Sequence, residues 1–200
     1  MSDLKKFNED RKVRISHEFL DKYRTGKLGI HAQKLLFGLA QCLDLAEDLF
    51  PDWDIDIRGL FDYLNLSEDN NDRYEIVRNA IRELAKNPLE YKISDKHWGL
   101  INWLSYAKFD ESNSMFVRLR FTDDCKPFLL NYKQYCEMQT KYYVGLTSAN
   151  AMWLYPHLRN AYKKKGGIHT ITIQHLQEIT YTDSLAAYDI NKNSSANKDS

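Results

Sequence analysis

The stretch WDIDIRGLFDYLNLSEDNNDRYEIVRNAIRELAK, residues 53–86, carries the strongest fold signal in the chain. Apolar residues alternate with aspartates over 53–57, which predicts a short half-buried strand. A short helix is expected at 58–66 and, after a polar turn, a longer helix at 73–86, which Asn87-Pro88 ends. One face of the longer helix is apolar, with Val77, Ala80, Ile81 and Leu84. A strand followed by two helices around a polar turn indicates a helix-turn-helix.

A two-stranded hairpin is expected directly after this unit. The spacing predicts strands at 97–109 and 115–122, joined by the polar turn Asp110-Glu111-Ser112-Asn113. A helix-turn-helix followed by a hairpin is the winged-helix plan, an α+β fold in which the second helix enters a major groove and the hairpin forms the wing. Ten residues are expected to be buried together: Leu36, Leu39, Ile57, Leu60, Leu64, Val77, Ile81, Leu84, Leu119 and Phe121.

Further elements are expected on both sides of the winged helix. The apolar spacing predicts strands at 11–19 and 168–173, and helices at 30–49, 123–139, 148–164 and 174–180. These elements suggest a complete first winged-helix domain at 1–145, the start of a second at 146–182, and a polar tail or truncation point at 183–200.

Cationic residues on the longer helix are candidate phosphate contacts. Arg78, Arg82 and Lys86 are spaced four apart on the face opposite the apolar one, so they share a ridge. A solvated helix face is an equally open interpretation, because Glu75 lies on the same ridge. A run of lysines at 163–165 fits either DNA contact or the dipole of a helix C-terminus. The candidate DNA-binding residues are Arg73, Arg78, Arg82, Lys86, Arg118, Arg120, Lys163, Lys164 and Lys165.

The first hairpin strand is apolar on both faces, which an exposed wing strand should not be. Either a helix of the same chain covers the second face, or a second copy does. The residues of this candidate dimer interface are Trp98, Leu100, Trp103, Leu104 and Tyr106.

Composition and charge restrict the partners. The chain is 43% hydrophobic, so it can bury a core, and its 28 basic and 28 acidic residues give a formal net charge of zero. Any site for a polyanion must therefore be a local patch. Three widely spaced cysteines, no secretory signal and no long apolar stretch predict a cytoplasmic protein without a membrane partner.

The motifs of common enzymes are absent from the sequence. There is no phosphate-binding G-x-x-x-x-G-K-[ST] loop, and the histidines and cysteines do not have the spacing of metal ligands. Tyr142-Tyr143 could suggest a DNA-nicking nucleophile, but no histidines stand near to hold the metal that such chemistry uses. We therefore expect no catalytic residues, no metal and no cofactor.

Several stretches together resemble the winged-helix replication initiator (Rep) proteins of theta-replicating plasmids. They follow in the order of the family's motifs: HAQKLL at 31–36, IDIRGLFDYLNLS at 55–67, the helix at 76–84, VRLRF at 117–121, KPFLL at 126–130, AMWLYPHL at 151–158 and TIQHLQEI at 172–179. The KPFLL stretch is the most specific of them. Two departures lie in the sixth stretch, where Trp153 replaces the usual arginine and Pro156 falls inside a helix.

The resemblance implies a replication initiator that binds repeated double-stranded origin DNA, forms a homodimer through its first domain and recruits host replication proteins. It also implies that the second domain makes the main sequence-specific contacts, and we expect residues 146–182 to form only the start of that domain, without its recognition helix and wing. The alternative is a winged-helix protein-interaction module or transcriptional regulator without initiator activity, which the neutral charge favours.

Overall fold

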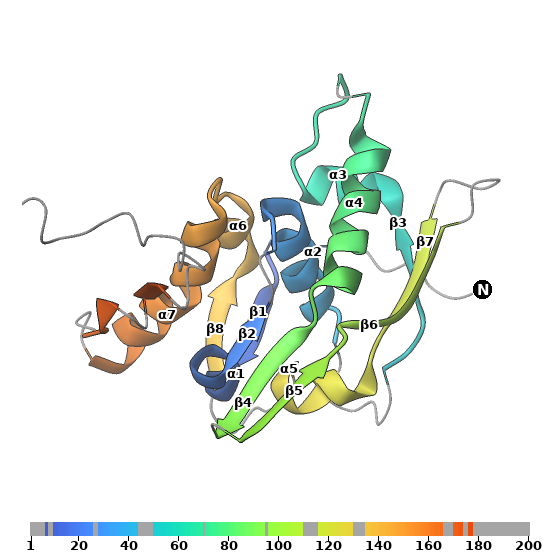
Figure 1. Cartoon of the computed structure of the whole chain (residues 1–200). Helices are drawn as coiled ribbons and strands as arrows, with labels where there is room; N and C mark the ends of the chain where they lie inside the picture. The colour runs from blue at the N-terminus through green and yellow to red at the C-terminus, as the bar shows by residue number, and fades with distance from the viewer. Residues whose placement is uncertain are drawn as a thin grey trace, which may run out of the picture.

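A computed structural model of the chain describes residues 7, 10–25, 28–43, 50–69, 71–94, 96–109, 116–129, 135–165, 170–173 and 176–177 (Figure 1). The helices are α1 (His17–Lys22), α2 (Ile30–Ala40), α3 (Ile57–Tyr63), α4 (Arg73–Lys86), α5 (Lys126–Leu129), α6 (Thr140–Val144) and α7 (Ala149–Lys165), with a 3-10 turn at Asp123–Cys125. The strands are β1 (Lys12–Ser16), β2 (Tyr23–Thr25), β3 (Trp53–Asp56), β4 (Leu89–Ser94), β5 (His97–Ile101), β6 (Leu104–Phe109), β7 (Phe116–Phe121) and β8 (Tyr135–Gln139). None of the described helices is long and apolar enough to cross a membrane.

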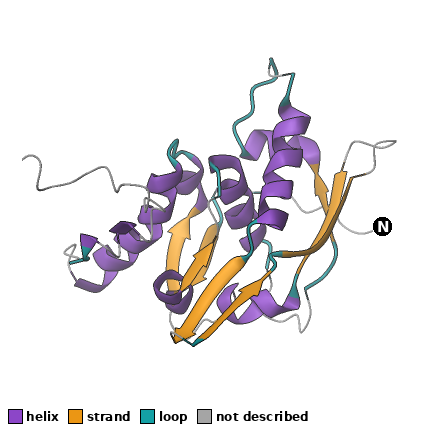
Figure 2. Ribbon diagram, in the orientation of Figure 1, coloured by secondary structure: helices purple, strands orange, loops and turns teal. Residues whose placement is uncertain are grey.

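The strands form three antiparallel sheets, ordered β1–β8, β2–β4–β5 and β3–β7–β6. Figure 2 shows strands on both sides of the central helices, and α4 packs against α2, α3 and β6. The helices α2, α3 and α4 with the sheet β3–β7–β6 make the winged helix, in which β6 and β7 are the wing strands. The predicted fold class is therefore confirmed.

The turn between α3 and α4 begins at a residue with left-handed backbone. Asn65 has a φ of 56°, and the amide of Leu66 donates to the carbonyl of Phe61 across it. Asparagine tolerates this conformation better than most residues, so it is suited to end a helix in a tight turn. At the other end of α3, the side chain of Asp56 accepts a hydrogen bond from the amide of Arg58. Both ends of this short helix are therefore defined by local sequence.

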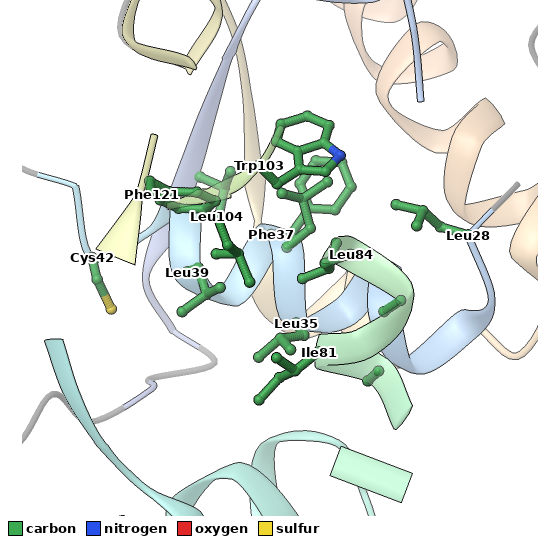
Figure 3. Close-up of a cluster of buried hydrophobic side chains, with 14 of the residues drawn as sticks. Leu28, Leu35, Phe37, Leu39, Cys42, Ile81, Leu84, Trp103, Leu104 and Phe121 are labelled. Atoms are coloured by element: carbon green, nitrogen blue, oxygen red, sulfur yellow. The ribbon is translucent and has the colours of Figure 1, made fainter. Parts of the chain in front are cut away.

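All ten residues predicted to form the core are buried, each at 3% exposure or less. Figure 3 shows Leu35 of α2 beside Ile81 and Leu84 of α4, with Trp103 and Phe121 in the same cluster. Gly38 of α2 lets the rings of Tyr63 and Phe7 pack closely against the helix. A Cβ at Gly38 would lie 2.6 Å from Cε1 of Tyr63, whose ring stacks on Phe7 at 4.8 Å. Only glycine fits here, despite its low helix propensity.

The single strand predicted at 97–109 is wrong. It is two strands in different sheets, β5 and β6, and the break between them sends the Trp103 side chain into the core. The carbonyl of Trp103 accepts from the amide of Thr122, which holds the break against the end of β7. The strand β4 was not predicted, and it pairs with β5 to form a second hairpin beside the wing.

The single helix predicted at 123–139 is also wrong. A 3-10 turn and the short helix α5 come first, and Tyr135–Gln139 is the strand β8. Cys136 and Met138 alternate with exposed or half-buried neighbours and pair in register with Ile15 and Val13 of β1, so the period is that of a strand.

Several predicted ends also differ. The strand predicted at 11–19 ends at Ser16, whose hydroxyl accepts from the amide of Phe19 and begins α1. The helix predicted at 30–49 ends at Ala40 in the structure, and 44–49 lie outside the described residues. Residues 170–172 are in no strand, and most of the helix predicted at 174–180 lies outside the described residues.

The helix α7 packs onto the winged-helix unit through its first half. Met152 and Trp153 belong to the common core, and Sγ of Cys136 donates to the carbonyl of Pro156 at 3.5 Å. The division at residue 145 between a first and a second domain stays a prediction.

Candidate nucleic-acid interface

The outward face of α4 carries the predicted cationic ridge. Because Val77, Ala80, Ile81 and Leu84 are buried, the opposite face of the helix points to solvent. Arg82 and Lys86 are exposed, and Arg78 is half-buried. The structure therefore places these three cations on one solvent-facing side of the second helix of the helix-turn-helix.

Two of these cations share one carboxylate. Nη1 of Arg78 lies 3.1 Å from Oε2 of Glu75, and Nη1 of Arg82 lies 3.1 Å from Oε1 of the same side chain. Arg82 also donates to Oδ1 of Asn79 at 3.2 Å. The ridge is therefore partly neutralised by a residue of its own helix.

Two arginines of α4 contact aromatic rings on neighbouring elements. The guanidinium of Arg78 lies 5.9 Å from the ring centroid of Phe109 on β6, so Arg78 reaches from the helix to the wing. The guanidinium of Arg73 lies 4.9 Å from the ring of Phe61 on α3, and Phe61 meets Tyr74 edge to face at 4.9 Å. Arg73 thus also joins the two helices, because cation–π contacts stabilise packing.

The predicted wing residue Arg118 is held by an ion pair. Its Nε and Nη2 donate to Oδ1 and Oδ2 of Asp54 on β3 at 2.6 and 2.7 Å. This bidentate pair raises the pKa of Arg118, and the Asp54 side chain is only 9% exposed. The alternation predicts a half-buried strand with the aspartates on its exposed face, but Asp54 is buried because it pairs with Arg118 across the sheet. On the same sheet, a hydrogen bond with Asp52 raises the pKa of Tyr106.

Arg120 is held in the same way at the end of β7. Its Nη2 lies 2.8 Å from Oδ2 of Asp123, while Oδ1 of Asp123 accepts from the amide of Phe50 at 2.9 Å. The hydrogen bond from Phe50 is the main cause that lowers the pKa of Asp123, and the guanidinium of Arg120 adds to it. Asp123 therefore ties the end of the wing to the chain before β3.

We expect Asp123→Asn to make stability less dependent on pH. A carboxylate whose pKa is lowered by folding stabilises the protein above its unfolded value, about pH 3.9, and that stabilisation is lost as the pH falls through the folded pKa. Urea midpoints measured from pH 7 to pH 3 should fall less steeply in the variant than in the parent chain. Asp124→Asn, at the exposed neighbouring carboxylate, should keep the parent slope. An unchanged slope in Asp123→Asn would contradict the assignment.

Lysines 163–165 form the last residues of α7, and their side chains lie outside what the structure describes. Figure 1 places this end of α7 on the opposite side of the molecule from the wing. The structure thus does not bring the lysines together with the ridge of α4.

The five residues of the candidate dimer interface separate into two groups. Trp98 and Leu100 on β5 are 66% and 57% exposed. Trp103 and Leu104 are buried inside the chain's own core, so their assignment to a dimer interface is wrong. Tyr106 is half-buried on the outer face of the wing sheet. Of these five residues, Trp98 and Leu100 are the two that are mostly exposed to a second copy.

The sequence reasoning missed one exposed cation of the wing. Lys108 pairs in register with Arg118, and its Nζ lies 5.3 Å from the ring centroid of Tyr106. Alternation from Tyr106 along the strand would have placed Lys108 on the same outer face. Among the described residues, no three His, Cys, Asp or Glu side chains come together in a group that could hold a metal ion.

Comparisons with known proteins agree with this architecture. Residues 12–159 match the family described as "Initiator Replication protein, WH1". The fold is similar to that in a crystal structure of the Pi initiator protein in complex with iteron DNA, with a TM-score of 0.65 and 15% sequence identity. That similarity covers 87% of this chain and 74% of the Pi chain. A search of curated proteins found no match.

Proposed function

Because the chain belongs to the family of initiator replication proteins, whose WH1 domain it carries, we propose that it initiates plasmid replication by binding repeated origin DNA. In this proposal it is not an enzyme. It self-associates through the first winged-helix domain, and it recruits host replication proteins at the origin.

The observation that carries the proposal is the outward face of α4. Arg78, Arg82 and Lys86 lie on the solvent side of the second helix of a helix-turn-helix, and Arg78 extends to the wing strand β6. Winged helices place these two elements against DNA. With a net charge of zero, attraction to phosphates has to come from such a local patch. The Pi initiator, which shares the fold, was crystallised with iteron DNA, and this supports the same class of ligand.

We expect the double variant Arg78→Ala and Arg82→Ala to bind every duplex more weakly. Phosphate contacts carry no sequence information, and each adds about 0.9 to the slope of log affinity against log salt concentration. Losing two of them should reduce that slope by roughly two. Fluorescence anisotropy of labelled duplexes, titrated with the full chain between 50 and 200 mM salt, measures both effects.

The matched control removes two cations that lie on β1 rather than on α4. Lys12 and Arg14 on β1 also share one carboxylate, Glu137, at 2.8 and 3.4 Å. Lys12→Ala with Arg14→Ala changes the net charge equally and should leave the salt slope unchanged. If the α4 variant binds as the parent does, or if binding ignores salt, Arg78 and Arg82 belong to a solvated helix face.

A second candidate is a protein-interaction module or transcriptional regulator without initiator activity. The exposure of Trp98 and Leu100 together with the zero net charge favours it. The same titration separates the two candidates, because this one predicts no loss of duplex binding in the α4 variant.

We also propose that self-association uses the strand β5. In the described part of the chain β5 has a partner strand, β4, on one side only. Trp98 and Leu100 share one face of β5, while Gly99 faces the other way under the ring of Tyr91. An apolar edge strand is a template for pairing with another chain. The family resemblance points to a dimer as well.

A further inference from the structure

The carboxylate of Glu75 occupies both arginines that we propose as phosphate contacts. Each of its oxygens faces one guanidinium, Oε2 that of Arg78 and Oε1 that of Arg82, and both distances are 3.1 Å. The arrangement is possible because positions 75, 78 and 82 lie on one ridge of α4. We infer that Glu75 competes with DNA phosphates for Arg78 and Arg82, and thereby lowers the affinity of this face for DNA. This inference rests on the proposed function.

The competition follows from the similar chemistry of the two anions. A carboxylate and a phosphodiester each carry one negative charge over two oxygens, and both accept from guanidinium groups. A duplex that docks on α4 must either displace Glu75 from the arginines or place a phosphate beside a carboxylate. Both routes make the free energy of DNA binding less favourable.

The exposure of the cluster makes this exchange reversible. The side chains of Arg78, Glu75 and Arg82 are 35%, 49% and 55% exposed. Exposed ion pairs are weak, because water and salt screen them. Glu75 therefore reduces binding to phosphates without preventing it, which favours duplexes that make additional contacts elsewhere on the protein.

A structural role for Glu75 makes a different prediction. Glu75 lies in the first turn of α4, where a negative charge stabilises the helix dipole. If that were its whole role, Glu75→Gln would lower the melting temperature slightly and would change DNA affinity only through the net charge. A charge-matched variant is therefore needed to isolate the effect on Arg78 and Arg82.

The test compares Glu75→Gln with Glu137→Gln in the full chain. Glu137 also bridges two cations, Lys12 and Arg14, but on the sheet β1–β8. The probe is a labelled 20-bp duplex of arbitrary sequence, titrated at 50, 100 and 200 mM salt. We expect Glu75→Gln to raise the affinity roughly threefold to tenfold, which is the effect of releasing two exposed ion pairs. Glu137→Gln should raise it less than about twofold.

A third variant tests whether the gain in DNA affinity depends on Arg78 and Arg82. When Arg78→Ala and Arg82→Ala are already present, Glu75→Gln should give no gain beyond that of Glu137→Gln. An equal gain with and without the arginines would be an effect of net charge, and it overturns the inference.

Failure of this inference and failure of the proposed function give different results. If the arginine variant binds DNA more weakly but Glu75→Gln binds no more tightly than the parent, only the role of Glu75 is overturned. If the Arg78→Ala and Arg82→Ala double variant binds DNA as the parent does, these arginines do not contact phosphates. The proposed DNA-binding role of α4 and the role of Glu75 are then both overturned.

Discussion

Leu60→Ala is expected to lower the free energy of unfolding by ~2–5 kcal/mol. Leu60 is fully buried in α3, where the helix packs against α4 and β3. Its replacement by alanine leaves a cavity among the buried side chains, and the fixed ends of α3 limit how far the helix can move to fill it. Urea denaturation followed by tryptophan fluorescence measures the loss.

The control is the same substitution at an exposed site. Leu158 of α7 is 59% exposed, so Leu158→Ala should change the free energy of unfolding by less than about 0.5 kcal/mol. A Leu60→Ala protein as stable as the Leu158→Ala protein would exclude the packing described for the helix-turn-helix.

Replacing Trp98 and Leu100 together with aspartate is expected to convert a dimer into a monomer. Both side chains are exposed on one face of the edge strand β5, so their replacement removes nothing from the core. Tryptophans at the centre of interfaces often contribute ~2 kcal/mol or more, and two added charges in each copy would meet across the interface. We expect the dissociation constant to rise by at least ~30-fold.

Sedimentation velocity at micromolar concentration measures this change. Tyr162→Asp is the control, because Tyr162 is 67% exposed but lies on α7. A parent chain that is strictly monomeric, or a double variant that still forms the dimer, would remove β5 from the proposed interface.

Local patterns predicted the winged helix well. The four-residue spacing of apolar side chains placed α4 at Arg73–Lys86, the bounds that the structure shows, because polar residues and Asn87-Pro88 flank it. The errors arose where packing between distant parts of the chain determines the local secondary structure. Trp103 interrupts a run of strand-forming residues because its ring fills the core, and the break separates two sheets. Nothing in the local sequence marks that position.

The candidate site was predictable only in part. Helical spacing brought Arg78 and Arg82 to one face, and it also placed Glu75 there. The partners of Arg118 and Arg120 could not be found in this way. Asp54 becomes a neighbour of Arg118 only through the register between β3 and β7, and the 3-10 turn that brings Asp123 to Arg120 was expected to be part of a long helix.

The pairing of β1 with β8 has a consequence for synthesis on the ribosome. Lys12 forms an ion pair with Glu137, 125 residues later in the chain. Among the described strands β8 alone pairs with β1, so the first strand stays without this partner until nearly the whole domain has been translated. At about 5–20 residues per second, β1 stays unpaired for roughly 6 to 25 seconds. During that time its apolar residues Val13 and Ile15 are available to other nascent chains. The alternating cations Lys12 and Arg14 give the unpaired strand a charged face, which discourages aggregation until β8 has been synthesised.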